Sequence, residues 1–499
     1  MTVSVEAPPQ LGRLRELLGV VADLRHAEAI ASWDSRVTMP VRGAPARADV
    51  SATLGRLAHE RFVADEIGEL LEELKPYEES LEYESDDASL IRVTRRDWDR
   101  DRRVPPELVG EMWRAGGLGV AAWDEAKAAS DFARLAPHLE RQLELRRRYI
   151  ECFPPADEPY DVLLETYEPG MTAAQVSAIF DEVKNAALPL VAAAPEIDDS
   201  FLDGDFPRDA QEEAGRLVLA ALGFAADSWR LDVTAHPFEA NPGISDIRLT
   251  THYNPDDMHS LFSTMHEFGH GVYEAGVDAA LARTPLECGT SAALHESQSR
   301  TWENLVGRSR PFWRWFYPTL RELFPGRLGS VGEDAFYRAV NAVKPSVIRF
   351  DADEVTYNLH IILRYELERE LLDGRVAVAD VPEAWNARMR EYLGVEPKDD
   401  ADGALQDMHW GAGLIGYFPT YSLGNVISVQ IWNRARADLD DLDEQIERGD
   451  FASLREWLRE YVYRHGRKFA PKELIERVSG GPIDAGPYVR YLREKLSSL

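Results

Sequence analysis

Apolar residues at three- and four-residue spacing run through most of this chain, and this periodicity restricts its fold more than any other feature. The stretch from residue 11 to residue 31 shows the pattern first, with apolar side chains at Leu14, Leu17, Leu18, Val21 and Leu24. Such spacing is typical of one face of an amphipathic helix. β-Branched residues in rough alternation are concentrated at residues 231–233 and 244–252, where we predict short strands. The sequence therefore predicts a mainly α-helical protein with one small β-sheet.

The chain shows no repeat, low-complexity tract or flexible linker that would separate independent domains. Breaks such as Pro154-Pro155 separate successive helices, because proline is excluded from a helix interior. Thr172 follows another break and is a predicted helix N-cap. Although 499 residues exceed a typical single core, we predict one unit over residues 1–499. Its two lobes are expected at about residues 1–230 and 231–499.

Composition restricts the partners and the compartment of the protein. The chain has 56 lysines and arginines against 87 aspartates and glutamates, a formal net charge of −31, which opposes binding to nucleic acid or anionic lipid. Its 2 cysteines are too few for a disulfide framework and suit a reducing compartment. Neither a signal peptide nor a run of 18 apolar residues is visible in the sequence. We predict a cytoplasmic protein with no nucleic-acid or membrane partner.

The segment His266-Glu267-Phe268-Gly269-His270 carries the clearest chemical signal. Two histidines four apart on a helix project from one face about 6 Å apart, which suits two ligands of one tetrahedral zinc ion. A glutamate directly after the first histidine can reach a metal-bound water and take its proton. Gly269 costs the helix about 1 kcal/mol relative to alanine, and so indicates that another backbone or a substrate passes close to it.

The start of this helix is also predicted from the sequence. Asn254 can serve as N-cap, Pro255 suits the first helical position, and Asp256 and Asp257 complement the positive end of the helix dipole. We therefore expect the helix to begin at Pro255.

The third metal ligand should come from a second helix. Glu296 follows His270 by 26 residues and lies in the stretch Ser291–Leu305, which has helical character. This separation fits the zinc peptidases whose third ligand is a glutamate on the next long helix; His295 is the alternative. Two histidines and one carboxylate leave a fourth position for a water, with Glu267 as general base. Zinc fits these ligands best, cobalt or manganese would also fit, and amide hydrolysis is the reaction this arrangement serves.

Further motifs extend the pattern along nearly the whole chain. In order they are His236-Pro237-Phe238, Asp246-Ile247-Arg248-Leu249-Thr250, His266 to His270, His295 to Ser299, Ile348 to Asp353, and Gly403 to Trp410. This series resembles the carboxypeptidase Taq family of metal-dependent carboxypeptidases. The resemblance implies a large, saddle-like helical body with a deep active-site groove, a small sheet beside the metal helix, and a homodimer. It also implies release of C-terminal residues from peptides with broad specificity, by a hydrolase whose metal-binding lobe is the second of the two.

An exopeptidase must recognise the free carboxylate of its substrate, which calls for a fixed guanidinium group. Arg349 and Arg248 both lie inside family-like motifs. Either could instead be an internal ion-pair partner, because Asp353 and Asp246 lie close in sequence. The resemblance favours Arg349, with Arg248 either assisting or structural.

The resemblance also suggests donors for the developing oxyanion, which needs hydrogen bonds besides the metal. His409 and Tyr421 follow the pattern by which related helical zinc peptidases place a histidine and a tyrosine opposite the metal, and Tyr417 is the alternative tyrosine.

The carboxylate that orients a ligand histidine is less clear. Other zinc peptidases with a glutamate ligand often hold an aspartate four residues later, but here that residue is Arg300. Asp407 and Asp246 are candidates for this role, and the sequence does not identify the carboxylate that fills it.

Two other functions remain open. A zinc oligopeptidase that cuts internally would use the same metal chemistry but would not need a carboxylate clamp. A peptide-binding protein of the same fold without turnover is less favoured, because Glu267 and all three candidate ligands are intact.

Overall fold

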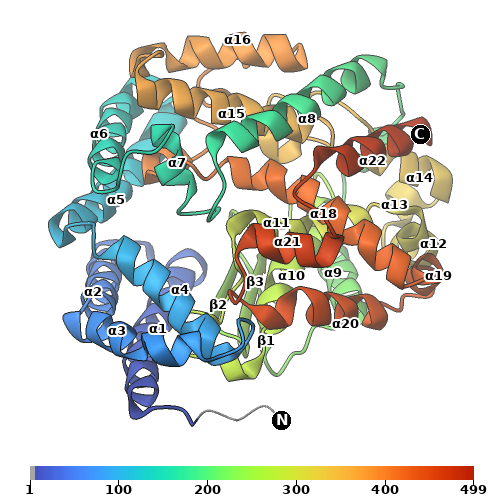
Figure 1. Ribbon diagram of the computed structural model, residues 1–499. Coiled ribbons are helices and arrows are strands. Elements are labelled where there is room, and N and C mark those ends of the chain that lie inside the picture. Colours follow the sequence, from blue (N-terminus) through green and yellow to red (C-terminus); the bar gives the residue numbers. More distant parts are fainter. Residues whose placement is uncertain (1–5) are drawn as a thin grey trace.

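The computed structural model describes residues 6–499, and helices form most of it, as predicted (Figure 1). The first part of the chain forms α1 (Pro9–Val37), α2 (Ala44–Phe62), α3 (Asp65–Glu79), α4 (Asp86–Asp101), α5 (Pro106–Ala129), α6 (Phe132–Ile150), α7 (Pro159–Leu164), α8 (Ala173–Ala193) and α9 (Arg208–Leu222). After the sheet come α10 (His259–Ala275), α11 (Ala292–Arg300), α12 (Arg310–Leu323), α13 (Pro325–Leu328), α14 (Glu333–Val340), α15 (Thr356–Asp373), α16 (Val381–Leu393), α17 (His409–Ala412), α18 (Pro419–Asp438), α19 (Leu442–Glu447), α20 (Ala452–Tyr461), α21 (Pro471–Ser479) and α22 (Ala485–Ser497). A π-helix, Thr301–Val306, continues α11 directly.

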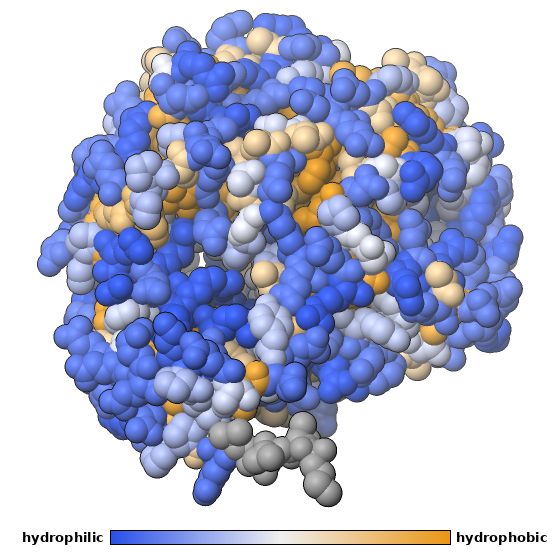
Figure 2. All heavy atoms as spheres, in the orientation of Figure 1, coloured by the Kyte–Doolittle hydropathy of each residue, from blue (hydrophilic) through white to orange (hydrophobic). Residues whose placement is uncertain are grey.

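The apolar interior of the described residues consists of a large cluster, a smaller one and a third formed only by Val104, Leu108 and Leu145. The large cluster runs from Trp123 to Leu492 and so includes residues on both sides of the predicted lobe boundary near residue 230. The smaller cluster joins α1, α3 and α4 to Val277, Leu281 and Leu286. Figure 1 shows α1–α4 together at the lower left, and Figure 2 shows a hollow lined by hydrophilic residues above them. No helix within residues 6–499 has the length and apolar character needed to cross a membrane.

The sheet has three strands, β1 (Trp229–Val233), β2 (Glu239–Gly243) and β3 (Asp246–Thr251). Their order is β1-β3-β2, with β1 parallel and β2 antiparallel to β3. β1 and β3 match the predicted strands, but β2 was not predicted. Its residues Ala240-Asn241-Pro242-Gly243 lack the β-branched side chains that mark a strand. Proline is tolerated there because β2 is an edge strand, where a missing N–H breaks no internal hydrogen bond.

The helix that carries the metal motif begins later than predicted. α10 starts at His259, four residues after Pro255, so the predicted start is wrong. Asn254 instead donates a hydrogen bond to Asp257 at 2.6 Å within the preceding turn. Asp257 accepts the backbone N–H of His259 at 2.9 Å and so satisfies one donor at the helix start. The predicted N-cap Thr172 is confirmed, since it forms a capping box with Gln175 at the start of α8.

Three glycines allow the elements around the metal motif to approach closely. A Cβ on Gly269 of α10 would lie 2.5 Å from the carbonyl oxygen of Gln298 and from the Cα of Ser299 in α11. A Cβ on Gly271 would meet β3 side chains, and one on Gly424 of α18 would lie 2.6 Å from Cγ of Glu296. The sheet, α10, α11 and α18 are therefore packed at distances that only glycine permits.

We expect Gly269→Ala to lower the free energy of unfolding, although alanine favours helix by about 1 kcal/mol. Overpacking against the backbone of α11 costs about 1–3 kcal/mol, and it also moves Glu296 away from the histidines. Denaturation midpoints and metal affinity measure both effects. Gly110→Ala is the matched control, because Gly110 is an exposed glycine of α5 with no atom within 4 Å of its added Cβ. Equal stability changes in the two variants would contradict the role of Gly269.

Candidate metal centre

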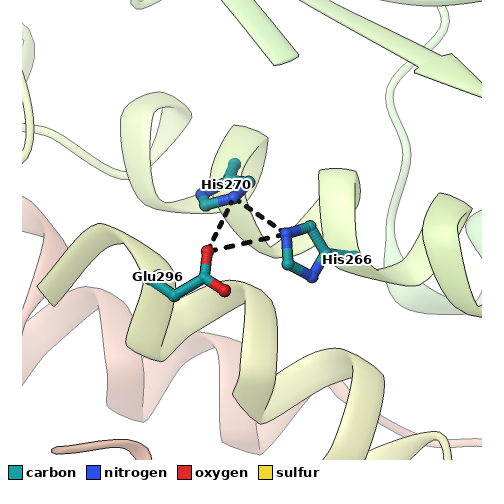
Figure 3. Close-up of side chains that lie close together, drawn as sticks. All are labelled: His266, His270 and Glu296. Atoms are coloured by element: carbon teal, nitrogen blue, oxygen red, sulfur yellow. Dashed lines mark hydrogen bonds and ion pairs between the residues drawn. The ribbon is translucent and has the colours of Figure 1, made fainter. Parts of the chain in front are cut away.

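Three side chains of α10 and α11 converge on one point (Figure 3). The Nε2 atoms of His266 and His270 lie 3.2 Å apart. Oε2 of Glu296 lies 3.6 Å from the first of these nitrogens and 3.5 Å from the second. Ligands of a tetrahedral zinc ion with bonds of about 2.0–2.1 Å are separated by about 3.3–3.4 Å. The triangle formed by the three atoms therefore has the size that a tetrahedral metal ion requires.

Glu303 fixes the ring of His266. Its Oε2 lies 2.8 Å from Nδ1 of His266. Burial raises the pKa of Glu303, but Arg300 and His266 outweigh burial and lower it to about 2, so the carboxylate is charged. It therefore accepts the Nδ1 proton and leaves the Nε2 lone pair free.

A chain of hydrogen bonds through His295 and Glu274 orients the ring of His270, so that its Nε2 also faces the centre. Its Nδ1 lies 2.5 Å from Nδ1 of His295, and Nε2 of His295 lies 2.7 Å from Oε1 of the buried Glu274. With Glu274 as final acceptor, His295 donates from Nε2 and accepts from His270, whose Nε2 keeps its lone pair. Burial lowers the pKa of His270 to about 3, which keeps the ring neutral. His295 uses both nitrogens in this relay and is not free to be the alternative ligand.

The centre thus gathers three acceptors without a donor among them. With Nδ1 of each ring protonated and directed outward, two imidazole lone pairs and one carboxylate oxygen meet at 3.2–3.6 Å, an arrangement that a cation between them stabilises. The donor set, two neutral nitrogens and one carboxylate oxygen, is one that zinc accepts. The residues therefore fit a divalent metal ion.

Glu267 is buried between this centre and the sheet, with 6 % of its surface exposed. It lies on the face of α10 that also carries Gly271, where a Cβ would touch side chains of β3. Burial raises the pKa of Glu267 to about 7, with His266 opposing the shift and Glu296 adding to it. A metal ion beside this carboxylate would favour its charged form.

A second cluster surrounds Arg349. Asp407 accepts from Nε of Arg349 at 3.1 Å and from Nη2 at 2.7 Å, and Arg364 binds the other oxygen of Asp407 at 2.7 Å. Nη1 of Arg349 donates to the hydroxyl of Tyr357 at 3.1 Å. A guanidinium group has five N–H donors, so Asp407 and Tyr357 leave part of the terminal edge of Arg349 for another acceptor. The carboxylate of Asp407 fixes the plane of that edge.

His409, Tyr417 and Tyr421 lie together beside Arg349. Nε2 of His409 is 3.1 Å from the hydroxyl of Tyr421, and the ring of His409 stacks on Tyr417 with centroids 5.7 Å apart. The guanidinium of Arg349 lies 5.2 Å from the ring centre of Tyr421. Burial lowers the pKa of His409 to about 4 and raises the pKa of Tyr421 well above its ordinary value. Both side chains are therefore neutral near pH 7.

Comparison with known proteins identifies the family. The model of the carboxypeptidase Taq (M32) metallopeptidases matches residues 13–496. The chain belongs to the carboxypeptidase Taq family. It is 40% identical to thermostable carboxypeptidase 1 of Thermus thermophilus, over 97% of this chain and 98% of that protein. It is 36% identical to carboxypeptidase 1 of Bacillus subtilis, over 97% of each chain.

A solved structure of the carboxypeptidase Taq family has the same fold. The crystal structure of an M32 carboxypeptidase from Deinococcus radiodurans matches with a TM-score of 0.92 and 42% identity, covering 98% of this chain and 99% of that one. As a member of the family, the protein is a metallocarboxypeptidase, a hydrolase that requires a divalent metal.

Arg248, the other arginine in a carboxypeptidase Taq motif, is held elsewhere. Nε and Nη2 of Arg248 each donate to Asp246 at 2.8 Å, and the guanidinium stacks on Trp33 with its carbon 4.6 Å from the ring centre. No interaction among the described residues joins Arg248 to Arg349 or to the three converging side chains.

Asp246 and Asp407, the two candidates for orienting a metal-motif histidine, are instead paired with arginines. Glu303 was missed, although it follows Glu296 by seven residues and so returns to the same helix face after about two turns. The relay through His295 and Glu274 left no sequence signal beyond its proximity to the motif.

We expect Glu303→Ala to weaken metal binding by about 10–100-fold, the usual effect of removing a group that orients a ligand histidine. Competition with a chromogenic chelator measures the affinity. Asp246→Ala removes a carboxylate that bonds only Arg248 and should leave the affinity unchanged. Equal affinities for wild type and Glu303→Ala would contradict the assignment of Glu303.

Proposed function

We propose that this metallocarboxypeptidase releases single residues from peptide C-termini with a zinc ion held by His266, His270 and Glu296. The observation that carries the proposal is the convergence of three acceptor atoms at 3.2–3.6 Å. Cobalt or manganese would fit the same donors. Broad specificity is proposed from the resemblance to the family.

Activation of the water molecule requires a Lewis acid, which the metal would supply, and a general base, which is Glu267. A zinc ion bound at this centre supplies a Lewis acid that polarises the scissile carbonyl and acidifies a water. The carboxylate of Glu267 takes the proton of that water as general base and then delivers it to the leaving amine nitrogen. Its buried position beside the sheet keeps bulk water from competing for the proton.

Tyr421 donates to the oxyanion that forms during the reaction. In the tautomer of His409 that is protonated at Nε2, this nitrogen donates to the hydroxyl oxygen of Tyr421, and this leaves the hydroxyl proton of Tyr421 for the oxyanion. The raised pKa of Tyr421 keeps that proton in place. Tyr417, which packs against both rings, remains the alternative donor.

Arg349 is proposed as the group that binds the substrate carboxylate. Its outer edge is oriented by Asp407 on one side and Tyr357 on the other, which suits a planar, two-oxygen acceptor. Arg248 is assigned a structural role, because Asp246 and Trp33 already engage it. An oligopeptidase that cuts internally would have no need for such a clamp beside the metal, and a peptide-binding protein without turnover would have no need for Glu267.

Assembly, location and lobe division are proposed on more general grounds. The resemblance supports a homodimer acting on peptides and a metal-binding lobe that begins near residue 231. The net charge of −31 and the unpaired Cys152 and Cys288 suit the cytoplasm and oppose nucleic-acid or anionic membrane partners.

Glu267→Gln should lower kcat by about 100–10,000-fold, the range attributed to general acid–base catalysis. Glutamine keeps the shape of the side chain but cannot accept the proton, and none of the proposed ligands is changed. Metal content by elemental analysis should therefore equal that of wild type. Turnover close to wild type would remove Glu267 from its role as general base.

Arg349→Ala should lower kcat/KM on peptides with a free C-terminus by roughly 100–10,000-fold, because two charge-assisted hydrogen bonds of about 1.5–3 kcal/mol each are lost. Amidated peptides should be poor substrates for wild type and variant alike. Mass spectrometry of peptide ladders with free and amidated ends measures both rates. Arg248→Ala is the control and should keep the preference for free ends. If only Arg248→Ala lost that preference, Arg248 would be the carboxylate-binding residue and Arg349 the structural one. Equal cleavage of both ladders by wild type would favour the oligopeptidase.

A further inference from the structure

Arg300 occupies an unusual place between two carboxylates of the candidate metal centre. It follows Glu296 by one helical turn, and 9% of its surface is exposed. Its Nε lies 2.7 Å from Oε1 of Glu296, and its Nη1 lies 3.0 Å from Oε2 of Glu303. The guanidinium carbon stacks 4.3 Å from the ring centre of Tyr357. The guanidinium plane is thus fixed from three sides.

The two oxygens of Glu296 have separate partners. Oε2 faces both Nε2 atoms of the histidines, at 3.6 Å and 3.5 Å, and accepts from the hydroxyl of Ser299 at 3.1 Å. Oε1 points to Nε of Arg300. The carboxylate therefore offers one oxygen to the centre and gives the other to the arginine.

Packing prevents the carboxylate from exchanging these oxygens easily. Gly424 of α18 lies so close that an added Cβ would be 2.6 Å from Cγ and 2.7 Å from Cβ of Glu296. Gly269 of α10 presses on the backbone of α11 from the other side. Packing thus keeps Glu296 beside the histidines, and the hydrogen bond from Arg300 sets the tilt of its carboxylate, with Oε1 turned away from the centre.

We propose that Arg300 is a positioning residue that holds Oε1 away, so that Glu296 binds the metal through Oε2 alone. The proposal rests on the ligand set of the proposed function. A carboxylate that binds through both oxygens takes two coordination positions, whereas catalytic zinc keeps one position open for water. By engaging Oε1, Arg300 preserves that open position, and its charge also draws electron density from the ligand.

Three substitutions separate the hydrogen bond of Arg300 from its charge. Arg300→Gln places a donor nitrogen at the chain position of Nε but carries no charge. Arg300→Lys keeps the charge but has a methylene group at that position, and Arg300→Met has neither donor nor charge. The cobalt(II)-loaded enzymes should be compared by visible absorption, which is strong for four-coordinate and weaker for five-coordinate cobalt, and by kcat and KM.

Wild type and Arg300→Gln are expected to give the four-coordinate spectrum. Arg300→Met and Arg300→Lys should give the weaker, five-coordinate spectrum, with kcat lowered by about 10–100-fold as for other groups that tune a metal ligand and KM changed much less. Arg467→Gln is the control: Arg467 is another largely buried arginine, paired with Asp97 at 2.8 Å and remote from the proposed ligands, so its loss should leave the spectrum unchanged.

Several outcomes would overturn the proposal. Rescue by lysine but not by glutamine would show that charge, not the hydrogen bond to Oε1, is what matters. An unchanged spectrum in Arg300→Met would show that Oε1 does not turn to the metal. If the variants do not fold, a structure of zinc-loaded wild type decides, because both Glu296 oxygens at bonding distance from zinc would contradict it. Failure of the ligand set itself is distinguishable, since wild type would then bind no cobalt at this centre.

Discussion

The contact between α10 and α11 at Gly269 is the interaction on which the metal centre depends. Two of the proposed ligands come from one helix and the third from another, 26 residues later in the chain. Their side-chain atoms approach within 3.6 Å only because the backbones of the two helices touch. Side chains of β3 pack against α10 at Gly271, and α18 packs against Glu296 at Gly424. The small sheet and the large helical body thus serve one geometric purpose.

The sequence predicted the chemistry of the centre better than its support. The convergence of His266 and His270 was predictable because helical spacing places them on one face, and Glu296 was predicted from its separation of 26 residues, which fits zinc peptidases with a glutamate ligand. β2 was not predictable from composition, since an edge strand tolerates Pro242 and Gly243. The relay from His270 was missed because it ends on Glu274, which no regular spacing relates to His295, whereas the partner of His266, Glu303, could have been found from its helical spacing after Glu296. Arg349 was favoured only by resemblance, and its partner Asp407 was considered for another role.

Two buried charged side chains near the centre each pair with two partners of opposite charge. Asp407 serves both Arg349 and Arg364, and Arg300 serves both Glu296 and Glu303. Pairs of this kind contribute little net stability, because removing both charges from water costs as much as the attraction returns. These pairs instead fix orientation, because the shared side chain, Asp407 or Arg300, holds both of its partners in place. In a chain with net charge −31, these arginines are placed where orientation is needed.

The π-helix at Thr301–Val306 makes the length of this segment as important as its composition. A π-helical turn holds one more residue than an α-helical turn. Deleting a single residue there would let the segment relax to an α-helix, which with one residue fewer turns through about the same angle. Residues beyond Val306 would keep their direction, and Arg308 its hydrogen bond to Val340, but Glu303 inside the segment would turn relative to His266 and Arg300. The extra residue of the π-helix therefore serves the position of Glu303 and not the course of the chain beyond it.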